Sequence, residues 1–467
     1  MPSNPIRSAS RAISPLASSL VRPTCPHPCR TFISPCSSLH NARPWPGSAR
    51  KSAIQVQRRR MSTSNLSRKH PVDFIPPTAT DLFDLRASVQ EFCKRNIPEE
   101  VAAAADGTNS FPADMWHKLG DAGLLGITAS AAQGGLDMGY EAHTIVMEEI
   151  SRASGSIGLS YAAHSQLCVN QVSLNGNQQQ KEKYLPSLLS GRMIGALAMS
   201  ETGAGSDVVS MKMKAEEVDG GYRLNGSKMW ITNGPDADLI VVYAKTAPPP
   251  TQPSKGVTAF LVETKSASGF SVARKLDKLG MRGSNTGELH FEDVFVPKEN
   301  VLGQLNKGVR VLMEGLDLER LVLSAGPLGL MRRALDEALP YVHTRQQFGV
   351  ALAKNQLVQG KLADMYTAYR AASAFTHEVA RTIDAAHNSP ETNFGIESRD
   401  CTSTILFAAE QATKVCLDAV QLLGGMGYMS EVPVGRLVRD AKLYEIGAGT
   451  SEIRRVVVGR SFEKEFS

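Results

Sequence analysis

The spacing of apolar residues changes twice along this chain of 467 residues, and this order restricts the fold more than any other feature. Residues 73–195 follow helical spacing, in segments such as 81–97, 113–122, 140–152 and 157–175. Residues 196–300 alternate like strands, and residues 301–467 return to helical runs near 306–342, 355–387, 398–422 and from 451. We therefore predict a helical domain, a small β domain and a second helical domain, in that order.

Turn residues refine this prediction. Thr80 is a candidate N-cap for the first helix, and Asp219-Gly220-Gly221 predicts a turn. Asn225-Gly226 is typical of a β-hairpin, and the prolines at 248–250 predict a surface loop. Because no long helical run separates the strands, the sheet is expected to be antiparallel or barrel-like rather than doubly wound. The long helices after residue 301, joined by short loops such as 388–396, predict an antiparallel bundle.

The basic charge of the chain is confined to its N-terminus. Residues 1–72 hold ten Arg, two Lys and no acid, whereas the rest holds 39 basic and 46 acidic side chains. An Arg- and Ser-rich segment without acids is typical of a mitochondrial presequence, although an attached basic arm is an alternative. The mildly acidic remainder argues against a nucleic-acid surface. No apolar run is long enough to predict an integral membrane protein, and the scattered cysteines predict neither a disulfide framework nor a metal site.

Two glycine-containing motifs carry a resemblance to a known family. Residues 197–207, Leu-Ala-Met-Ser-Glu-Thr-Gly-Ala-Gly-Ser-Asp, resemble the flavin-contacting signature of acyl-CoA dehydrogenases. Residues 421–428 resemble a second signature of the family, and 439–442 follow it in the expected order. Alone, each motif is weak, and neither is a dinucleotide-binding fingerprint. The resemblance runs from about 75 to 465, and it implies a helical domain, a β-barrel-like domain and a four-helix-bundle-like domain.

Within the family, residues 316–320 and 444–452 are most similar to members that act on isovaleryl-CoA. The resemblance implies FAD-dependent oxidation of that thioester to 3-methylcrotonyl-CoA in leucine breakdown. A buried carboxylate takes the α-proton in this chemistry, because burial raises the basicity of the group. The family places the carboxylate at one of two positions. Here Ala448 occupies one and cannot accept a proton, so the resemblance implies that Glu319 is the catalytic base.

Helix geometry points to Glu319 independently. Steps of three and four residues place it on one stripe with Leu312, Leu316, Leu323 and Gly326, so that an acid interrupts an apolar face. The alternatives are an ion pair with Arg320 or a neighbouring helix, or exposure at the margin of the helix.

The resemblance also implies a set of FAD contacts. Within the first motif and the β domain they are Leu197, Ala198, Met199, Ser200, Glu201, Thr202, Gly203, Ala204, Gly205, Ser206, Trp230, Ile231 and Thr232. Trp230 has the alternative of lying in the β-domain core. The contacts expected from the C-terminal domain are Arg345, Gln356, Gln421, Leu422, Leu423, Gly424, Gly425, Thr450, Ser451 and Glu452. Arg345, Gln356 and 421–425 match residues that reach the FAD of a neighbouring subunit, which implies a homotetramer, a dimer of dimers.

The implied substrate contacts are Ser206, Ser254, Lys255, Arg310, Asp317, Leu318, Glu319, Arg320, Gly447, Ala448 and Gly449. Gly447 replaces a bulky side chain of the straight-chain members and is expected to leave room for a methyl branch. Its alternative is a purely conformational role. Arg310 stands where the isovaleryl pattern has tyrosine, near the CoA arm. Arg320 leaves the stripe, so its role is either structural or near the CoA moiety.

The resemblance further implies electron transfer to electron-transfer flavoprotein in the mitochondrial matrix. Three alternatives remain: a dehydrogenase of 2-methylbutyryl- or isobutyryl-CoA, a non-catalytic member of the family, and an oxidase that reduces oxygen.

Overall fold

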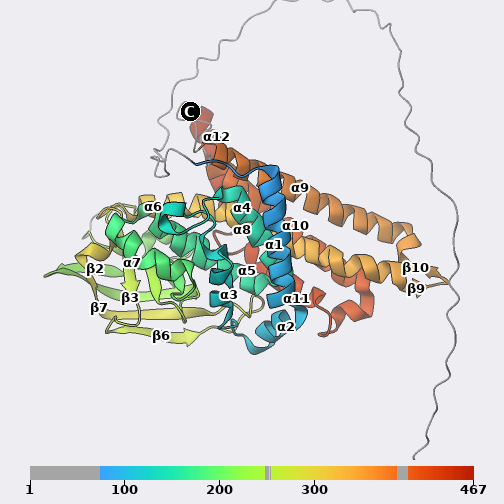
Figure 1. The fold of residues 1–467 in the computed structure, drawn as a ribbon, viewed down its shortest axis with the longest axis horizontal. Helices are drawn as coiled ribbons and strands as arrows, with labels where there is room; N and C mark the ends of the chain where they lie inside the picture. Colours follow the sequence, from blue (N-terminus) through green and yellow to red (C-terminus); the bar gives the residue numbers. More distant parts are fainter. Residues whose placement is uncertain (1–73, 248–251, 253, 387–397, 467) are drawn as a thin grey trace, which may run out of the picture. The chain divides into compact units, whose positions relative to one another are not determined.

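The computed structural model describes residues 74–247, 252, 254–386 and 398–466 (Figure 1). The predicted presequence at 1–72, the proline loop at 248–250 and the loop at 388–396 lie outside the described residues. Helices come first along the described chain, strands follow, and helices return after residue 308. This order confirms the predicted fold class.

The first helical segment comprises α1 (Ala79–Asn96), α2 (Glu99–Thr108), α3 (Met115–Asp121), α4 (Gly139–Ala153), α5 (Gly155–Ala162), a π-helix (Ala163–Val169), α6 (Asn170–Asn175) and α7 (Gln178–Leu189). The last segment comprises α8 (Gly308–Thr344), α9 (Gln356–Ala386), α10 (Ser398–Leu423), α11 (Val434–Tyr444) and α12 (Ser451–Phe466). Short 3-10 turns lie at Leu124–Gly126, Ala131–Gln133, Val208–Ser210, Lys298–Asn300, Leu352–Lys354 and Gly424–Tyr428.

The strands are β1 (Gly195–Ala198), β2 (Lys214–Val218), β3 (Gly221–Thr232), β4 (Leu239–Lys245), β5 (Val257–Glu263), β6 (Phe270–Lys275), β7 (Thr286–Pro297) and β8 (Val301–Leu302). They form one sheet in the order β6-β7-β3-β2-β4-β5-β8, with β1 paired to β4. Most pairs are antiparallel, as predicted, but β1 and β2 each run parallel to β4. A separate hairpin of β9 (Gln346–Gln347) and β10 (Val350–Ala351) follows α8.

The hairpin predicted at Asn225-Gly226 is wrong. β3 runs straight through these residues, and the turn between β2 and β3 is made by Asp219 and Gly220, since Val218 pairs with Gly221. Gly226 instead sits at an irregularity in the pairing with β7, with a φ of 144°. A side chain there would lie 3.0 Å from the backbone of Met213. The glycine therefore serves a close approach of two chain segments rather than a turn.

The N-cap predicted at Thr80 is also wrong. α1 is capped by Thr78, whose hydroxyl accepts the backbone N–H of Asp81 at 3.2 Å, while the Asp81 carboxylate accepts the N–H of Thr78 at 2.8 Å. This reciprocal capping box requires a side chain that accepts hydrogen bonds three residues after the cap. Thr80 lies inside the first turn and is not in that position.

The two faces of β4 pack against different cores. Leu239, Val241 and Tyr243 join the apolar side chains of the π-helix, α7 and the start of α8. The alternate residues Ile240, Val242 and Ala244 pack with side chains of β3, β5 and β7. This alternation places the beginning of α8 directly against the sheet.

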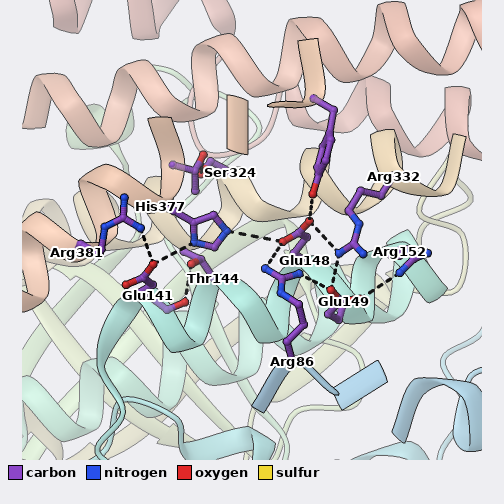
Figure 2. Close-up of polar contacts among 12 residues, drawn as sticks. Arg86, Glu141, Thr144, Glu148, Glu149, Arg152, Ser324, Arg332, His377 and Arg381 are labelled. Carbon is purple, nitrogen blue, oxygen red and sulfur yellow. Dashed lines mark hydrogen bonds and ion pairs between the residues drawn. The ribbon is translucent and has the colours of Figure 1, made fainter. Parts of the chain in front are cut away.

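The helical core is built by α4, α8, α9 and α10, which run side by side in Figure 1. A buried charge network joins three of these helices to α1 (Figure 2). The completely buried carboxylate of Glu148 on α4 pairs with Arg86 at 2.9 Å and Arg332 at 3.2 Å, and it accepts the Tyr369 hydroxyl at 3.0 Å. Across the described part of the chain, none of the helices has the length and hydropathy of a membrane span.

Candidate active site

Glu319 lies in the first half of α8 and is only 7% exposed. The other residues of its predicted stripe, Leu312, Leu316, Leu323 and Gly326, are buried as well. The Oε2 atom of Glu319 has no hydrogen-bond partner among the described residues. The alternative of an exposed acid at the helix margin is therefore wrong. An unpartnered buried carboxylate is costly to maintain, which is a reason to look for a function.

Burial raises the pKa of Glu319 to about 7, while the charges of Arg320 and Arg454 act in the opposite direction. The neighbouring Arg320 does not form the ion pair with Glu319 that was the other alternative. Its Nη1 atom donates to Asp317 at 2.9 Å and to Thr402 of α10 at 3.4 Å. Asp317 also accepts the Ser398 hydroxyl at 2.7 Å, so this pair ties α8 to the start of α10. Leu318, which precedes Glu319 in the sequence, is buried.

Tyr243 of β4 belongs to the same surroundings, although no sequence pattern singled it out. Burial and, secondarily, the charge of Glu319 raise the pKa of its hydroxyl. That hydroxyl is buried and has no hydrogen-bond partner within the described ranges. Two unpartnered polar groups, from α8 and β4, thus lie close enough to influence each other electrostatically.

The loop between α11 and α12 carries Gly447, Ala448 and Gly449. Ala448 has a φ of 56° and Gly449 a φ of 90°, so the turn uses the left-handed region at both residues. Gly447 is outside that region, and a Cβ built on it would meet Leu443 O at an ordinary 3.5 Å. The backbone therefore does not require glycine at 447. Of the two roles considered for Gly447, providing space for a methyl branch explains the residue better than backbone conformation does.

The first predicted flavin motif forms a compact turn after β1. Glu201 and Ala204 exchange backbone hydrogen bonds of 3.1 and 3.0 Å. Thr202, Gly203, Gly205 and Ser206 are exposed, and a Cβ on either glycine would meet no atom within 4 Å. Leu197, Ala198 and Ala204 are buried, and Met199 and Ser200 are half-buried. The open backbone of this turn is accessible to a ligand.

Glu201 anchors that turn. Its carboxylate accepts the N–H groups of Lys212 at 2.6 Å and Met213 at 3.0 Å. The completely buried ammonium of Lys228 donates to Glu201 Oε1 at 2.9 Å and to Met199 O at 3.0 Å. Both oxygens of Glu201 are thus used by the protein. Sequence reasoning missed Lys228, because a single lysine in a strand is usually solvated.

Trp230 is 54% exposed, so the alternative of a β-core tryptophan is wrong. Its φ of 61° is unusual for a bulky residue, and the pairing of β3 with β7 shifts register between Lys228 and Ile231. Ile231 is buried and Thr232 half-buried. The bulge turns the indole out of the sheet, where a planar ligand can stack on it.

Arg345 and Gln356 lie far from Glu319. Arg345 directly follows α8, 26 residues after Glu319, which corresponds to roughly 39 Å along a helix. Gln356 begins α9, and both side chains are exposed. The β9–β10 hairpin lies at the ends of α8 and α9 that face each other along the chain (Figure 1). At the end of α10, Gln421, Gly424 and Gly425 are exposed, whereas Leu422 and Leu423 are buried. The structure does not bring Arg345 or Gln356 to Glu319 within one chain.

The start of α12 is a separate part of the predicted cofactor set. The hydroxyl of Thr450 accepts the N–H of Ile453 at 3.3 Å and so caps the helix. Ser451 is buried and Glu452 exposed. A 16-residue helix presents a partial positive charge at this end, which favours anionic groups.

The predicted CoA contacts Ser254, Lys255 and Arg310 lie just before β5 and in the first turn of α8. Ser254 and Lys255 are exposed immediately before β5. The Asn306 N–H donates to the Thr258 hydroxyl at 2.8 Å, which fixes the start of α8 against β5. Arg310 is exposed, and its Nε donates to Glu314 at 2.8 Å. The described residues contain no group of acidic, His and Cys side chains suited to a metal ion.

Comparison with known proteins agrees with this geometry. The models for the N-terminal, middle and C-terminal domains of acyl-CoA dehydrogenases match residues 80–192, 196–294 and 306–462. The isovaleryl-CoA dehydrogenase of Oryza sativa is 58% identical over 81% of this chain and 90% of its own length. A 2-methylacyl-CoA dehydrogenase of Solanum tuberosum is 57% identical over 81% of this chain and 90% of its own length.

Among solved structures, butyryl-CoA dehydrogenase of Megasphaera elsdenii superimposes with a TM-score of 0.78 at 32% identity, covering 83% of this chain and all of that one. The order of domains, the buried acid on α8 and the identity to these relatives lead to one conclusion. The chain belongs to the acyl-CoA dehydrogenase family.

Proposed function

We propose that this acyl-CoA dehydrogenase oxidises isovaleryl-CoA to 3-methylcrotonyl-CoA in the mitochondrial matrix, with Glu319 as the base. The observation that carries the proposal is the buried carboxylate of Glu319, whose Oε2 finds no hydrogen-bond partner in the described part of the chain, combined with Ala448 at the other position that the family uses for its base. Curated relatives named isovaleryl-CoA dehydrogenase are also named mitochondrial, and the acid-free segment 1–72 supports the same location.

Glu319 removes the α-proton of the thioester. Its pKa of about 7 makes it a stronger base than an exposed glutamate while leaving a large ionised fraction at the pH of the matrix. The surrounding leucines of α8 exclude water and so preserve this basicity. When FAD is bound, it supplies the acceptor for the β-hydride.

The described residues fit FAD. The open turn at Gly203 and Gly205 permits close approach of a ligand to the backbone, and the outward Trp230 offers a stacking surface. The N-terminus of α12, with Thr450 and Glu452, is suited to the diphosphate or ribose. Gly424 and Gly425 are equally open, and with Arg345 and Gln356 we assign them to the FAD of a neighbouring subunit.

A homotetramer would supply that neighbour. Large apolar side chains are exposed close to the same residues: Phe348 in the β9–β10 hairpin, Leu357 at the start of α9 and Tyr428 after α10. Apolar groups exposed together in this way mark interaction surfaces. Light scattering on the purified protein measures the assembly directly. As electron acceptor we propose electron-transfer flavoprotein, and peroxide formation without an added acceptor would indicate an oxidase instead.

The pH dependence of flavin reduction tests the base. Because the ionised form of Glu319 accepts the proton, the rate of flavin bleaching by isovaleryl-CoA under anaerobic conditions is expected to rise through about pH 7 and then to level off. Single-turnover absorbance measurements between pH 5.5 and about 9 record this profile. A rate that is flat across the range contradicts the assignment, and a colourless protein contradicts catalysis altogether.

A second candidate substrate is 2-methylbutyryl-CoA, because a 2-methylacyl-CoA dehydrogenase is almost as similar to this chain. Relative kcat/KM on isovaleryl-, 2-methylbutyryl- and isobutyryl-CoA separates the candidates. A preference for isovaleryl-CoA is expected, since Gly447 leaves space that we assign to the branch at the β-carbon.

Gly447→Val is expected to lower kcat/KM for isovaleryl-CoA by about 10- to 200-fold, the range for a methyl-sized change in a pocket. Straight-chain butyryl-CoA is expected to lose much less, so the ratio of the two values is the measurement. Gly459→Val on the exposed side of α12 is the control, because a Cβ there meets no atom within 4 Å. Equal losses on both substrates would mean that Gly447 does not select for the branch.

A further inference from the structure

Arg454 is a buried arginine that the proposed chemistry has not yet used. It lies in the first turns of α12 and is 1% exposed. Its Nη1 donates to Tyr444 O at 2.7 Å, and its Nη2 donates to Gly447 O at 2.6 Å. Its Nε has no hydrogen-bond partner among the described residues. Moving an arginine out of water is costly, so its place in the interior calls for an explanation.

The two carbonyls accepting from Arg454 lie at the start and in the middle of the loop between α11 and α12. Tyr444 ends α11, and Gly447 immediately precedes Ala448. The left-handed φ of 56° at Ala448 costs an alanine about 1 kcal/mol or more, so the loop does not hold this shape by local preference. The guanidinium supplies two charge-assisted hydrogen bonds that fix it. Arg454 thereby sets the position of the glycine that provides space for the branch.

The charge of Arg454 also acts on Glu319. Burial lowers the pKa of Arg454 to about 10, and repulsion by Arg320 adds to this, while attraction by Glu319, Glu410 and Glu445 opposes it. Arg320 is partly neutralised by its ion pair with Asp317. In contrast, the hydrogen bonds of Arg454 go to neutral carbonyls, and no described carboxylate binds its guanidinium directly. Its positive charge therefore acts on Glu319, and it is also attracted by the charges of Glu410 and Glu445.

We propose that Arg454 is a positioning residue that clamps the loop carrying Gly447 and supplies a positive charge to the surroundings of Glu319. This inference rests on the proposed function, because it takes Glu319 as the base. The groups that act electrostatically on Glu319 are Arg320 from its own helix and Arg454 from α12, and Tyr243 of β4 lies within its influence. Arg454 and Arg320 favour the carboxylate form, so removing either charge leaves burial less opposed and raises the pKa of the base.

The test compares Arg454→Gln with Arg454→Lys. Glutamine keeps a hydrogen-bond donor but removes the charge, whereas lysine keeps the charge but cannot span both carbonyls in the same way. In Arg454→Gln the midpoint of the pH profile for flavin bleaching is expected to rise by about one pH unit, the lower range for an opposite charge nearby. Bleaching at pH 7 is then about fivefold slower and recovers at about pH 9. Arg454→Lys is expected to keep the wild-type midpoint.

The clamp has its own readout. Both variants are expected to lose part of the selectivity for isovaleryl-CoA over butyryl-CoA, because each loosens the loop at Gly447. Arg455→Met is the matched control, since this neighbouring side chain is 54% exposed and pairs with Glu410 on the surface. It is expected to change neither the midpoint nor the selectivity.

An unshifted midpoint in Arg454→Gln, with lower amplitude or thermal stability alone, overturns the proposal and leaves a structural arginine. If Arg454→Gln does not retain FAD, Arg454→Lys decides: a wild-type midpoint with reduced selectivity supports the proposal, and a displaced midpoint overturns it. Failure of the wild-type protein to bleach with isovaleryl-CoA is a different result, because it refutes the proposed function itself.

Discussion

Glu319→Gln is expected to remove turnover of isovaleryl-CoA while the purified protein still binds FAD. Removing a general base typically costs about 10²- to 10⁴-fold in rate, or roughly 3–5 kcal/mol of barrier. Glutamine has nearly the same shape and lies on the same buried stripe, so the helix packing is retained. Single-turnover bleaching measures the rate, and the flavin absorbance spectrum measures cofactor content.

The same substitution is expected to stabilise the fold at alkaline pH. The pKa of Glu319 is raised in the folded state, so its ionisation opposes folding once the pH passes about 4.5, and the full penalty is present above about pH 7. A pKa raised by two to three units corresponds to a loss of roughly 3 kcal/mol in the free energy of unfolding. Glu319→Gln should therefore melt at a higher temperature than wild type at pH 8 and at a similar temperature at pH 4.5. Lost activity with gained stability distinguishes a catalytic carboxylate from a structural one.

Glu337→Gln is the matched control, because it removes another carboxylate from α8 that pairs only with Arg333 among the described residues. It is expected to leave the bleaching rate near that of wild type. Wild-type turnover in Glu319→Gln would refute the role of Glu319 as base.

Among the substitutions named above and below, Glu148→Gln is expected to cause the largest loss in the free energy of unfolding. The carboxylate is completely buried in the network of Figure 2, and removing one partner of a buried ion pair typically costs about 3–5 kcal/mol. Arg86 and Arg332 would lose a counter-charge, while their remaining partner Glu149 cannot satisfy both fully. Urea denaturation at pH 7 measures the free energy of unfolding.

The pH dependence of this loss follows from the shifted pKa. Burial alone would raise the pKa of Glu148, but the hydrogen bond to His377 and the charges of Arg86 and Arg332 outweigh it and lower the pKa to about 2. The stabilisation from the carboxylate is therefore complete above about pH 4.5 and disappears as the pH falls towards 2. The difference between Glu148→Gln and wild type should shrink over that window. Glu91→Gln, in an exposed pair with Arg95, should change stability little at either pH.

Local patterns predicted the parts of the site that lie on regular elements. The stripe around Glu319 was readable because helix periodicity fixes which residues share a face. The same reasoning failed at Asn225-Gly226, where a strong hairpin signal was overridden by the contact with Met213. Turn preferences describe the isolated chain, whereas the bulge in β3 is set by a segment that packs against it.

The residues that sequence reasoning missed share one property. Tyr243, Lys228 and Arg454 act on partners in other elements: the proposed base on α8, the predicted flavin turn after β1 and the loop before α12. Each looks ordinary in its own segment, and only the tertiary arrangement gives it a role. The resemblance to the family identified the motifs, but it did not identify these three residues.

The distance along α8 has a consequence for the proposed tetramer. The helix carries the proposed base of one active centre in its first half, and Arg345, which we assign to the flavin of the adjacent subunit, directly follows its end. One helix then contributes residues to two catalytic centres. A substitution at the end of α8 would lower the activity of the adjacent subunit, even if that subunit has the normal sequence. Tetramers that mix normal and altered subunits would therefore lose more activity than their fraction of altered subunits predicts.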